Sequence, residues 1–285
     1  MPGPEVVACP SHRALARAAA ARSMVLLRSE PVDGRPVLPW DRDALRQVAA
    51  VGRLADLPNT GDHGSSDVRA PEVVTFLQGL HAALPATDVV YTDGEDVQTA
   101  ARLAADADTA LVVVGHTADD EGEYVSSELF TDPELLELLP PASTAEGASE
   151  GPDQERNTGQ TPLGGEAGII GSFSTGGHDA DDRLTLRPED EELILAVTAA
   201  NPRTVVGIVA AGPVLTGRWR DQAPSQLMLW YAGMEGGNAL PDVLLGRCDA
   251  AGRLPFRSRV PRTTCRTSTG THASLSTTSG TDSVS

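Results

Sequence analysis

The chain has 285 residues, of which 40 are acidic and 22 are basic, and its formal net charge is -18. Because a surface of this sign repels a phosphate backbone, we expect no nucleic-acid partner. No stretch approaches the roughly 18 consecutive apolar residues that span a bilayer, and the first residues lack the basic and apolar regions of a secretory signal. We therefore expect a cytoplasmic protein with no membrane partner.

The three cysteines, Cys9, Cys248 and Cys265, lie far apart and have no metal-ligand spacing. A sparse, odd set of this kind predicts reduced thiols with a structural role. We expect neither a metal ion nor a cofactor.

Helical and strand patterns alternate through the first 115 residues. Alanine-rich residues 11–28 predict a helix, with Ser11 as its N-cap, that leads into a short strand at 24–27. A turn-rich connector follows at 32–41. The pattern then predicts a strand at 47–52, a helix at 71–84, a strand at 88–91, a helix at 96–105 and a strand at 110–114. This βαβαβ order is typical of a parallel sheet covered by helices.

The same alternation returns after a long interruption. Residues 126–181 are rich in Gly, Ser, Thr, Glu and Asp and have no periodicity, so we expect a long flexible insertion. The pattern then predicts a helix at 187–200, strands at 204–210 and 226–231, and a helix at 235–245. Residues 257–285 contain almost nothing apolar and predict a disordered Ser/Thr-rich tail. The expected fold is one domain over 1–256, a mostly parallel α/β sheet with helices on both faces, which is a three-layer α/β sandwich.

The strand at 110–114 runs through Gly115 into an acidic loop that contains Glu121 and Glu123. Five consecutive apolar residues predict a strand buried on both faces, and ligands gather outside the carboxyl ends of such strands. These two glutamates are therefore the first candidates for catalysis. From composition alone, solvated loop acids are the simpler explanation in a chain this acidic.

Several segments, taken together and in order, resemble one family. They are residues 15–27 with 38–39, 61–68, 112–115 with 121–124, 182–186, 201–206, 230–237 and 252–256. Each is weak alone, but their collinear order resembles the C-terminal α/β-sandwich domain of glycoside hydrolase family 3, the family of β-glucosidases and related exo-acting enzymes. The resemblance implies retaining hydrolysis of O-glycosyl bonds in carbohydrate metabolism, with a β-linked glycoside as substrate.

The resemblance also implies how the catalytic groups are divided between domains. In this family an aspartate nucleophile lies on an N-terminal (β/α)8 barrel, and in many members an acid/base glutamate lies on a loop of the second domain. Glu123 best matches the acid/base position, and Glu121 is the second choice because the alignment of this loop can slip by two residues. Like charges on Asp119 and Asp120 would raise the pKa of such a carboxyl, as a general acid requires.

Four polar residues match a loop that borders the sugar pocket in the family, and the resemblance implies substrate binding by Asp62, His63, Ser65 and Ser66. A tight turn whose side chains cap the next helix explains the same residues equally well. Asp182 and Arg183 match a position where we expect a structural salt bridge that fixes the lid loop. We assign no role to His116, and we expect Trp219 and Trp230 in the core or at a domain interface.

The sequence departs from the family pattern in the part that supplies the nucleophile. No segment matches the family's nucleophile, and the barrel is lacking, so we expect the isolated chain to be inactive unless a separate barrel domain supplies the aspartate. The tail also lacks the family's continuation, and a shifted reading frame or a truncated gene would produce its composition. The alternative is a non-catalytic module that binds carbohydrate or a partner, or a truncated remnant. Nucleotide binding is a weaker hypothesis, because no G-x-G-x-x-G turn follows a strand.

Overall fold

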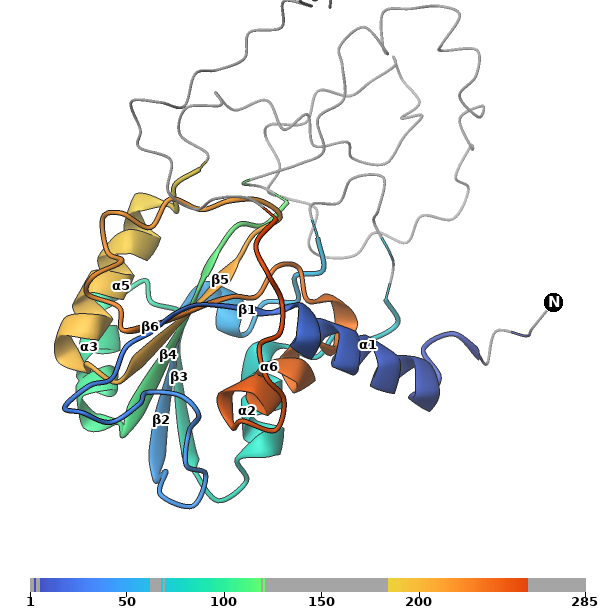
Figure 1. Cartoon of the computed structure of the whole chain (residues 1–285), viewed down its shortest axis with the longest axis horizontal. Coiled ribbons are helices and arrows are strands. Elements are labelled where there is room, and N and C mark those ends of the chain that lie inside the picture. Colours follow the sequence, from blue (N-terminus) through green and yellow to red (C-terminus); the bar gives the residue numbers. More distant parts are fainter. Residues whose placement is uncertain are drawn as a thin grey trace, which may run out of the picture.

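A computed structural model describes residues 3, 6–61, 68, 70–118, 120 and 184–255. Its centre is one six-stranded sheet (Figure 1). The strands are β1 (Val25–Ser29), β2 (Gln47–Val51), β3 (Asp88–Thr92), β4 (Thr109–Gly115), β5 (Thr204–Val209) and β6 (Ser225–Met228). Their order in the sheet is β1-β6-β5-β4-β2-β3, and all neighbours are parallel except β1 and β6, which are antiparallel. The predicted mostly parallel sheet is confirmed.

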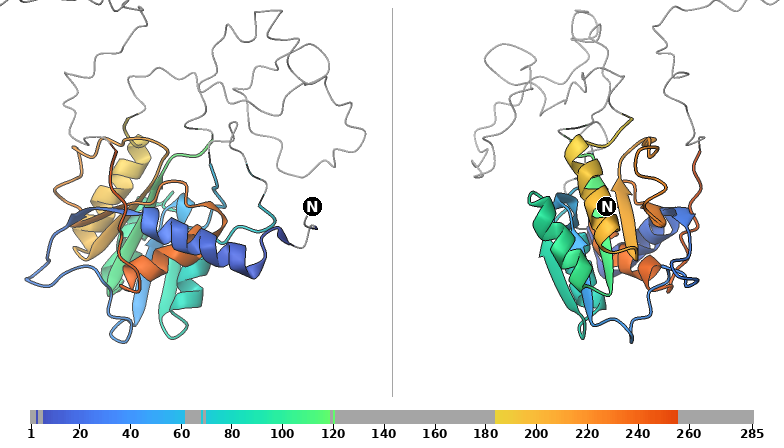
Figure 2. Two further views of the ribbon diagram at one scale, coloured as in Figure 1. Left: turned by 45° about the vertical axis from the view of Figure 1, so that its right-hand side comes forward. Right: turned by 90° about the vertical axis from the view of Figure 1, so that its left-hand side faces the viewer.

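Helices cover both faces of this sheet, as the right-hand view of Figure 2 shows. They are α1 (Pro10–Ser23), α2 (Phe76–Ala83), α3 (Val97–Asp106), α5 (Pro188–Ala200) and α6 (Gly236–Leu244), with short 3-10 helices η2 (Arg53–Ala55) and η4 (Gly233–Glu235). Helices α1, α2 and α6 pack on one face, and α3 and α5 pack on the other. The expected three-layer α/β sandwich is therefore correct.

Strand β4 shows why an uninterrupted apolar run predicts this architecture. Successive side chains of a strand point to opposite faces, so both faces of β4 need apolar residues when both are covered. Ala110, Val112 and Val114 face the α3 and α5 layer, while Leu111 and Val113 face the α1, α2 and α6 layer. All five residues are fully buried.

The structure corrects several predicted boundaries. Helix α2 begins at Phe76 rather than at 71, because Thr75 and Gln78 form a reciprocal capping box. Helix α1 begins at Pro10, with Cys9 rather than Ser11 in the N-cap position. Strand β6 ends at Met228 rather than at 231, and Trp230 just beyond it has a φ of 56°. The predicted insertion at 126–181 and tail at 257–285 lie outside the described residues.

Candidate functional site

The carboxyl ends of β2 and β4 meet at one edge of the sheet, and each strand is followed there by tightly packed backbone. Gly52, directly after β2, has a φ of 105°, and Gly115, the last residue of β4, has a φ of 137°. A Cβ on Gly52 would lie 2.3 Å from the carbonyl oxygen of Val113, and one on Gly115 would lie 1.9 Å from that of Val209. Both positions require glycine for conformation and for space. The chain can therefore leave β4 in close contact with both neighbouring strands.

Asp120 is the centre of a charge cluster just beyond this edge. Its Oδ2 accepts hydrogen bonds from the backbone N–H of Thr117 at 2.9 Å and from the Thr117 hydroxyl at 3.1 Å. Arg53, from η2, donates to the same oxygen at 3.1 Å, and Arg187, directly before α5, donates to Oδ1. Burial opposes ionisation of Asp120, but Arg187 and the Thr117 N–H outweigh it and hold the pKa of the carboxyl below its ordinary value.

This pairing adds a feature that the sequence interpretation did not contain. The argument for a raised pKa at the candidate acid counted Asp120 as an uncompensated negative charge. Two guanidinium groups pair with this carboxylate and partly compensate its charge, although it still acts to raise the pKa of the nearby Asp190. Asp119, the other residue in that argument, lies outside the described residues.

Asp190, in the first turn of α5, adds a second carboxyl to the cluster. It is buried, and its Oδ2 has no hydrogen-bond partner among the residues that the structure describes. Burial raises the pKa of Asp190, although the charges of Arg53 and Arg187 and a backbone hydrogen bond from Gly115 partly oppose this. Two carboxyls in one cluster are thus shifted in opposite directions.

The sequence interpretation missed Asp190, Arg53 and Arg187. Asp190 was assigned to an acid-rich helix terminus, where solvent exposure is the ordinary expectation. One signal in the sequence could have predicted that the Asp190 side chain is buried. Asp190, Ile194 and Val197 have the i, i+4, i+7 spacing of one helix face. No local pattern marks the two arginines, because they come from segments that are far apart in the sequence.

His116 has a structural position at the same edge. Its side chain is buried, and its Nε2 lies 3.4 Å from the carbonyl oxygen of Thr185. The Asn59 side-chain amide donates to the carbonyl oxygen of His116 at 2.9 Å. These contacts join the chain before residue 62, the chain after β4 and the chain that resumes at 184.

The predicted site residues themselves all lie outside the described residues. They are Glu121, Glu123, Asp62, His63, Ser65, Ser66, Asp182 and Arg183. The structure does describe residues that flank these positions in the sequence. Asn59 precedes the first group, Asp120 precedes the two glutamates, and Thr185 follows the last pair, and contacts at the carboxyl edge of β4 connect these flanks.

Trp219 and Trp230 both contribute to packing or to contacts between elements of the fold. Trp219 is fully buried in the core on the α3 and α5 side of the sheet, as expected. The Trp230 Nε1 donates to the carbonyl oxygen of Ser23 at 3.0 Å, which joins the end of β6 to the end of α1. Neither contact is that of a free sugar-stacking surface.

The described part of the chain contains no group of His, Cys, Asp and Glu side chains that could hold a metal ion. Cys9 and Cys248 are free thiols there. Among the helices that the structure describes, none has the length and hydrophobicity needed to cross a membrane.

Comparison with known proteins gives one consistent family. Residues 24–276 match the family described as "Glycosyl hydrolase family 3 C-terminal domain". A "Probable beta-glucosidase I" of Aspergillus terreus is 39% identical over 90 residues, which are 32% of this chain and 10% of that protein. A "Periplasmic beta-glucosidase" of Salmonella typhimurium is 25% identical over 250 residues, which are 86% of this chain and 28% of that protein.

Solved structures agree on the fold. The GH3 beta-glucosidase of Bifidobacterium adolescentis superimposes with a TM-score of 0.56 at 23% identity, over 83% of this chain and 27% of that one. The chain thus spans 10% to 28% of the length of these relatives. From the match over residues 24–276, the chain belongs to glycosyl hydrolase family 3, and the matched region is the C-terminal domain of that family.

Proposed function

We propose that this chain is the second domain of a retaining glycoside hydrolase that acts on β-linked O-glycosides, and that it supplies the acid/base glutamate. The observation that carries the proposal is the family match over residues 24–276. The names of the relatives, which are β-glucosidases, favour a β-glucoside as the substrate class. We assign the domain to residues 1–256.

Glu123 is the proposed acid/base residue, with Glu121 as the second choice. In the first step it would protonate the leaving oxygen while an aspartate of the barrel domain attacks the anomeric carbon, and in the second it would deprotonate water. The two carboxyl groups of such a pair lie about 5 to 5.5 Å apart. Substrate contacts are assigned to the polar residues Asp62, His63, Ser65 and Ser66, and a structural salt bridge is assigned to Asp182 and Arg183.

The charge cluster at Asp120 affects this proposal directly. Asp120 immediately precedes Glu121, and Thr117, Arg53 and Arg187 fix its carboxylate. A general acid needs a raised pKa, and an Asp120 that is paired with two guanidinium groups contributes less to it than an unpaired carboxylate would. The nucleophilic carboxylate of the barrel is then the charge that would raise the pKa of Glu123, since two close carboxyls cannot both ionise readily.

It follows that the isolated chain should have no glycosidase activity. Hydrolysis needs both carboxyls, and this proposal assigns the nucleophile to a separate barrel domain. The alternative, a non-catalytic module that binds carbohydrate or a partner, or a truncated remnant, makes a different prediction, because it requires no role for either glutamate.

The test measures hydrolysis of glucosides by the chain alone and after mixing with the barrel domain of a family relative. Glu123→Gln and Glu121→Gln are compared with Glu189→Gln, which alters an exposed acid of α5. We expect activity only in the mixture, and a loss of about 100-fold or more in Glu123→Gln for alkyl glucosides. The loss should be smaller for dinitrophenyl glucosides, whose leaving group needs no proton, and azide should restore their turnover.

The other outcomes separate the hypotheses. The same pattern in Glu121→Gln alone would move the role to Glu121. Full activity in both variants would exclude an acid/base role for this chain. If every mixture is inactive although circular dichroism shows a folded chain, the binding-module or remnant hypothesis is supported, and titration with cello-oligosaccharides would distinguish these two.

A further inference from the structure

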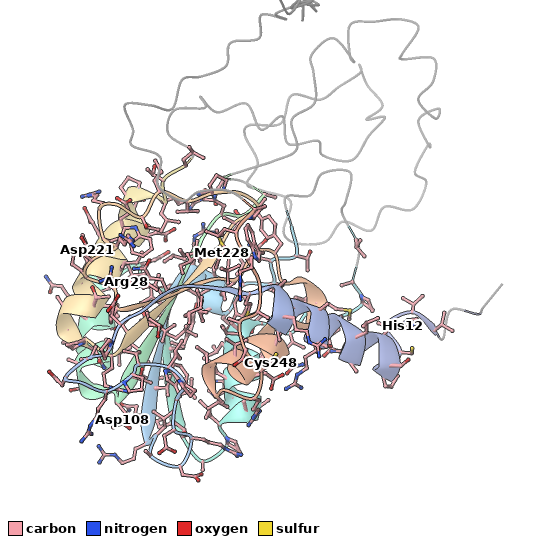
Figure 3. The ribbon with its side chains drawn as sticks, viewed as in Figure 1. His12, Arg28, Asp108, Asp221, Met228 and Cys248 are labelled. Carbon is pink, nitrogen blue, oxygen red and sulfur yellow. The ribbon has the colours of Figure 1, made fainter. Side chains whose placement is uncertain are left out.

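A cavity of about 280 Å³ lies near the β1 edge of the sheet. Its walls come from β1, β5, β6, the loop after β5 and the last described segment. The apolar lining residues include Val25, Leu27, Ile208, Val214, Met228 and Leu254. Figure 3 labels Met228 of β6, which marks the position of the cavity on the ribbon.

The cavity exists because helices cover this face of the sheet unevenly. Helix α5 packs on β4 and β5, and α3 packs on β2 and β3. The first two strands in the order, β1 and β6, are instead covered by the 211–224 loop, through side chains such as Val214 and Trp219. A loop leaves less regular packing than a helix, and Leu26, which also lines the cavity, is 44% exposed at its margin.

One end of the cavity carries a positive charge. Arg220 lines it, together with Thr216 and Gln226. Among the described residues, the Arg220 guanidinium makes no ion pair, and the neighbouring Asp221 pairs with Arg28 at 3.1 Å instead. In Figure 3, Arg28 and Asp221 lie together at the left of the ribbon.

Gln226 is held rigidly beside Arg220. Its Nε2 donates to the backbone carbonyl oxygens of Arg220 and Ala223, both at 2.8 Å. The polar residues of the cavity are thus held by fixed backbone, while the Arg220 side chain has no hydrogen bond or ion pair within the described ranges of the chain.

We propose that this cavity binds a small amphipathic carboxylate, with its hydrocarbon chain among the apolar residues and its carboxylate on Arg220. The volume of about 280 Å³ is at the lower limit of ligand pockets, roughly 300 to 1,000 Å³, which favours a short chain. Guanidinium binds carboxylate through paired, charge-assisted hydrogen bonds. Because the whole chain carries a net charge of -18, long-range attraction does not favour anions, so binding depends on the local site.

The test is calorimetric titration of the full chain with octanoate and with the uncharged analogue octan-1-ol. We expect octanoate to bind about tenfold or more tightly than the alcohol, and Arg220→Gln to remove this difference. Arg218→Gln is the matched control, because Arg218 lies in the same loop, pairs with Glu191 and does not line the cavity. Tryptophan fluorescence, to which Trp219 of the same apolar cluster as Ile208 and Met228 contributes, gives a second readout.

Two outcomes would overturn the proposal. The first is no octanoate binding by wild-type chain with a cooperative thermal transition. The second is equal binding by Arg220→Gln and wild type. Neither outcome depends on glycosidase activity.

Discussion

The carboxylate of Asp120 is bound by the guanidinium of Arg187, although residues 121–186 separate them in the sequence. Asp120 follows the end of β4, and Arg187 directly precedes α5. Arg53, after β2, binds the other oxygen of the same carboxylate. The two flanks of the segment that contains Glu121 and Glu123 are therefore joined by a contact among residues of the sheet edge itself.

We predict that Arg187→Gln lowers the free energy of unfolding by about 1 to 2 kcal/mol. The Asp120 side chain is only 12% exposed, so its charge would lose a close partner in a place that water reaches poorly. The estimate is modest because Arg187 itself is 41% exposed and Arg53 remains. Urea unfolding followed by circular dichroism measures the change.

The control for this prediction is Arg46→Gln, which removes a pair with Asp108 in which the arginine is 89% exposed. Its effect should be within about 0.5 kcal/mol. An Arg187→Gln variant as stable as Arg46→Gln would mean that the Asp120 pair adds nothing beyond an ordinary surface contact.

The fold could be predicted from the sequence because each of its signals is local. The apolar run of β4 specifies a strand with two covered faces, and alternation of strands and helices specifies a parallel sheet. Boundaries failed where a competing local signal was stronger. Pro71 suggested a helix start, but the capping box of Thr75 and Gln78 begins four residues later.

The charge state of the candidate site could not be predicted in the same way. Asp120, Arg53 and Arg187 come from three elements, and only the sheet order brings them together. The sequence shows acidic neighbours in the loop, whereas the fold adds the cations. Local composition therefore shows the carboxylates of this region but not the guanidinium groups that pair with Asp120.

At Asn201 the replacement of one heavy atom should have a large effect on stability. It is buried, its Nδ2 donates to the carbonyl oxygens of Ala104 and Ala107 at 2.8 and 2.9 Å, and its Oδ1 accepts from the Arg203 N–H at 2.9 Å. Asn201→Asp replaces the donor by an anion that faces two carbonyls, so we expect a loss of about 3 kcal/mol. Thermal and urea unfolding provide the measurement.

Asn201→Ala separates charge from lost hydrogen bonds at this position. It removes the same contacts without adding an anion, and we expect a smaller loss, about 2 kcal/mol. An aspartate variant as stable as wild type would contradict the assignment of the amide as donor to α3 and to the segment before β4.

Gly79 and Gly237 set how closely α2 and α6 can pack. A Cβ on Gly79 would lie 1.6 Å from the carbonyl oxygen of Gly237, and one on Gly237 would lie 2.0 Å from that of Thr75. Because backbone cannot move aside as a side chain can, either substitution to alanine should separate the helices and cost about 3 kcal/mol or more. Gly217→Ala is the control, since nothing lies within 4 Å of its Cβ position. It should change the free energy of unfolding by less than about 0.5 kcal/mol. If alanine at Gly79 or Gly237 has the same small effect, the close-packing argument is refuted.

The pair between Arg17 and Asp242 predicts how stability depends on pH. Arg17 of α1 donates from Nε and Nη2 to the two Asp242 oxygens of α6 at 2.6 and 2.8 Å. Burial opposes ionisation of Asp242, but Arg17 outweighs it and holds the pKa of the carboxyl below its ordinary value. The unfolded chain therefore binds this proton more tightly than the native chain does. The stabilisation is complete above roughly pH 5 and is lost as the pH falls through the native pKa.

Asp242→Asn should remove this contribution, which we expect to be about 1 kcal/mol because Arg17 is 40% exposed. The difference between wild type and variant, measured by urea unfolding from neutral to acidic pH, should be largest near neutrality and shrink toward roughly pH 3. High salt should reduce it throughout. Asp249→Asn, an exposed residue without an ion pair among the described residues, should give no such pH-dependent difference. A constant difference across the pH range would show that Asp242 stabilises the α1 and α6 contact by packing rather than by charge.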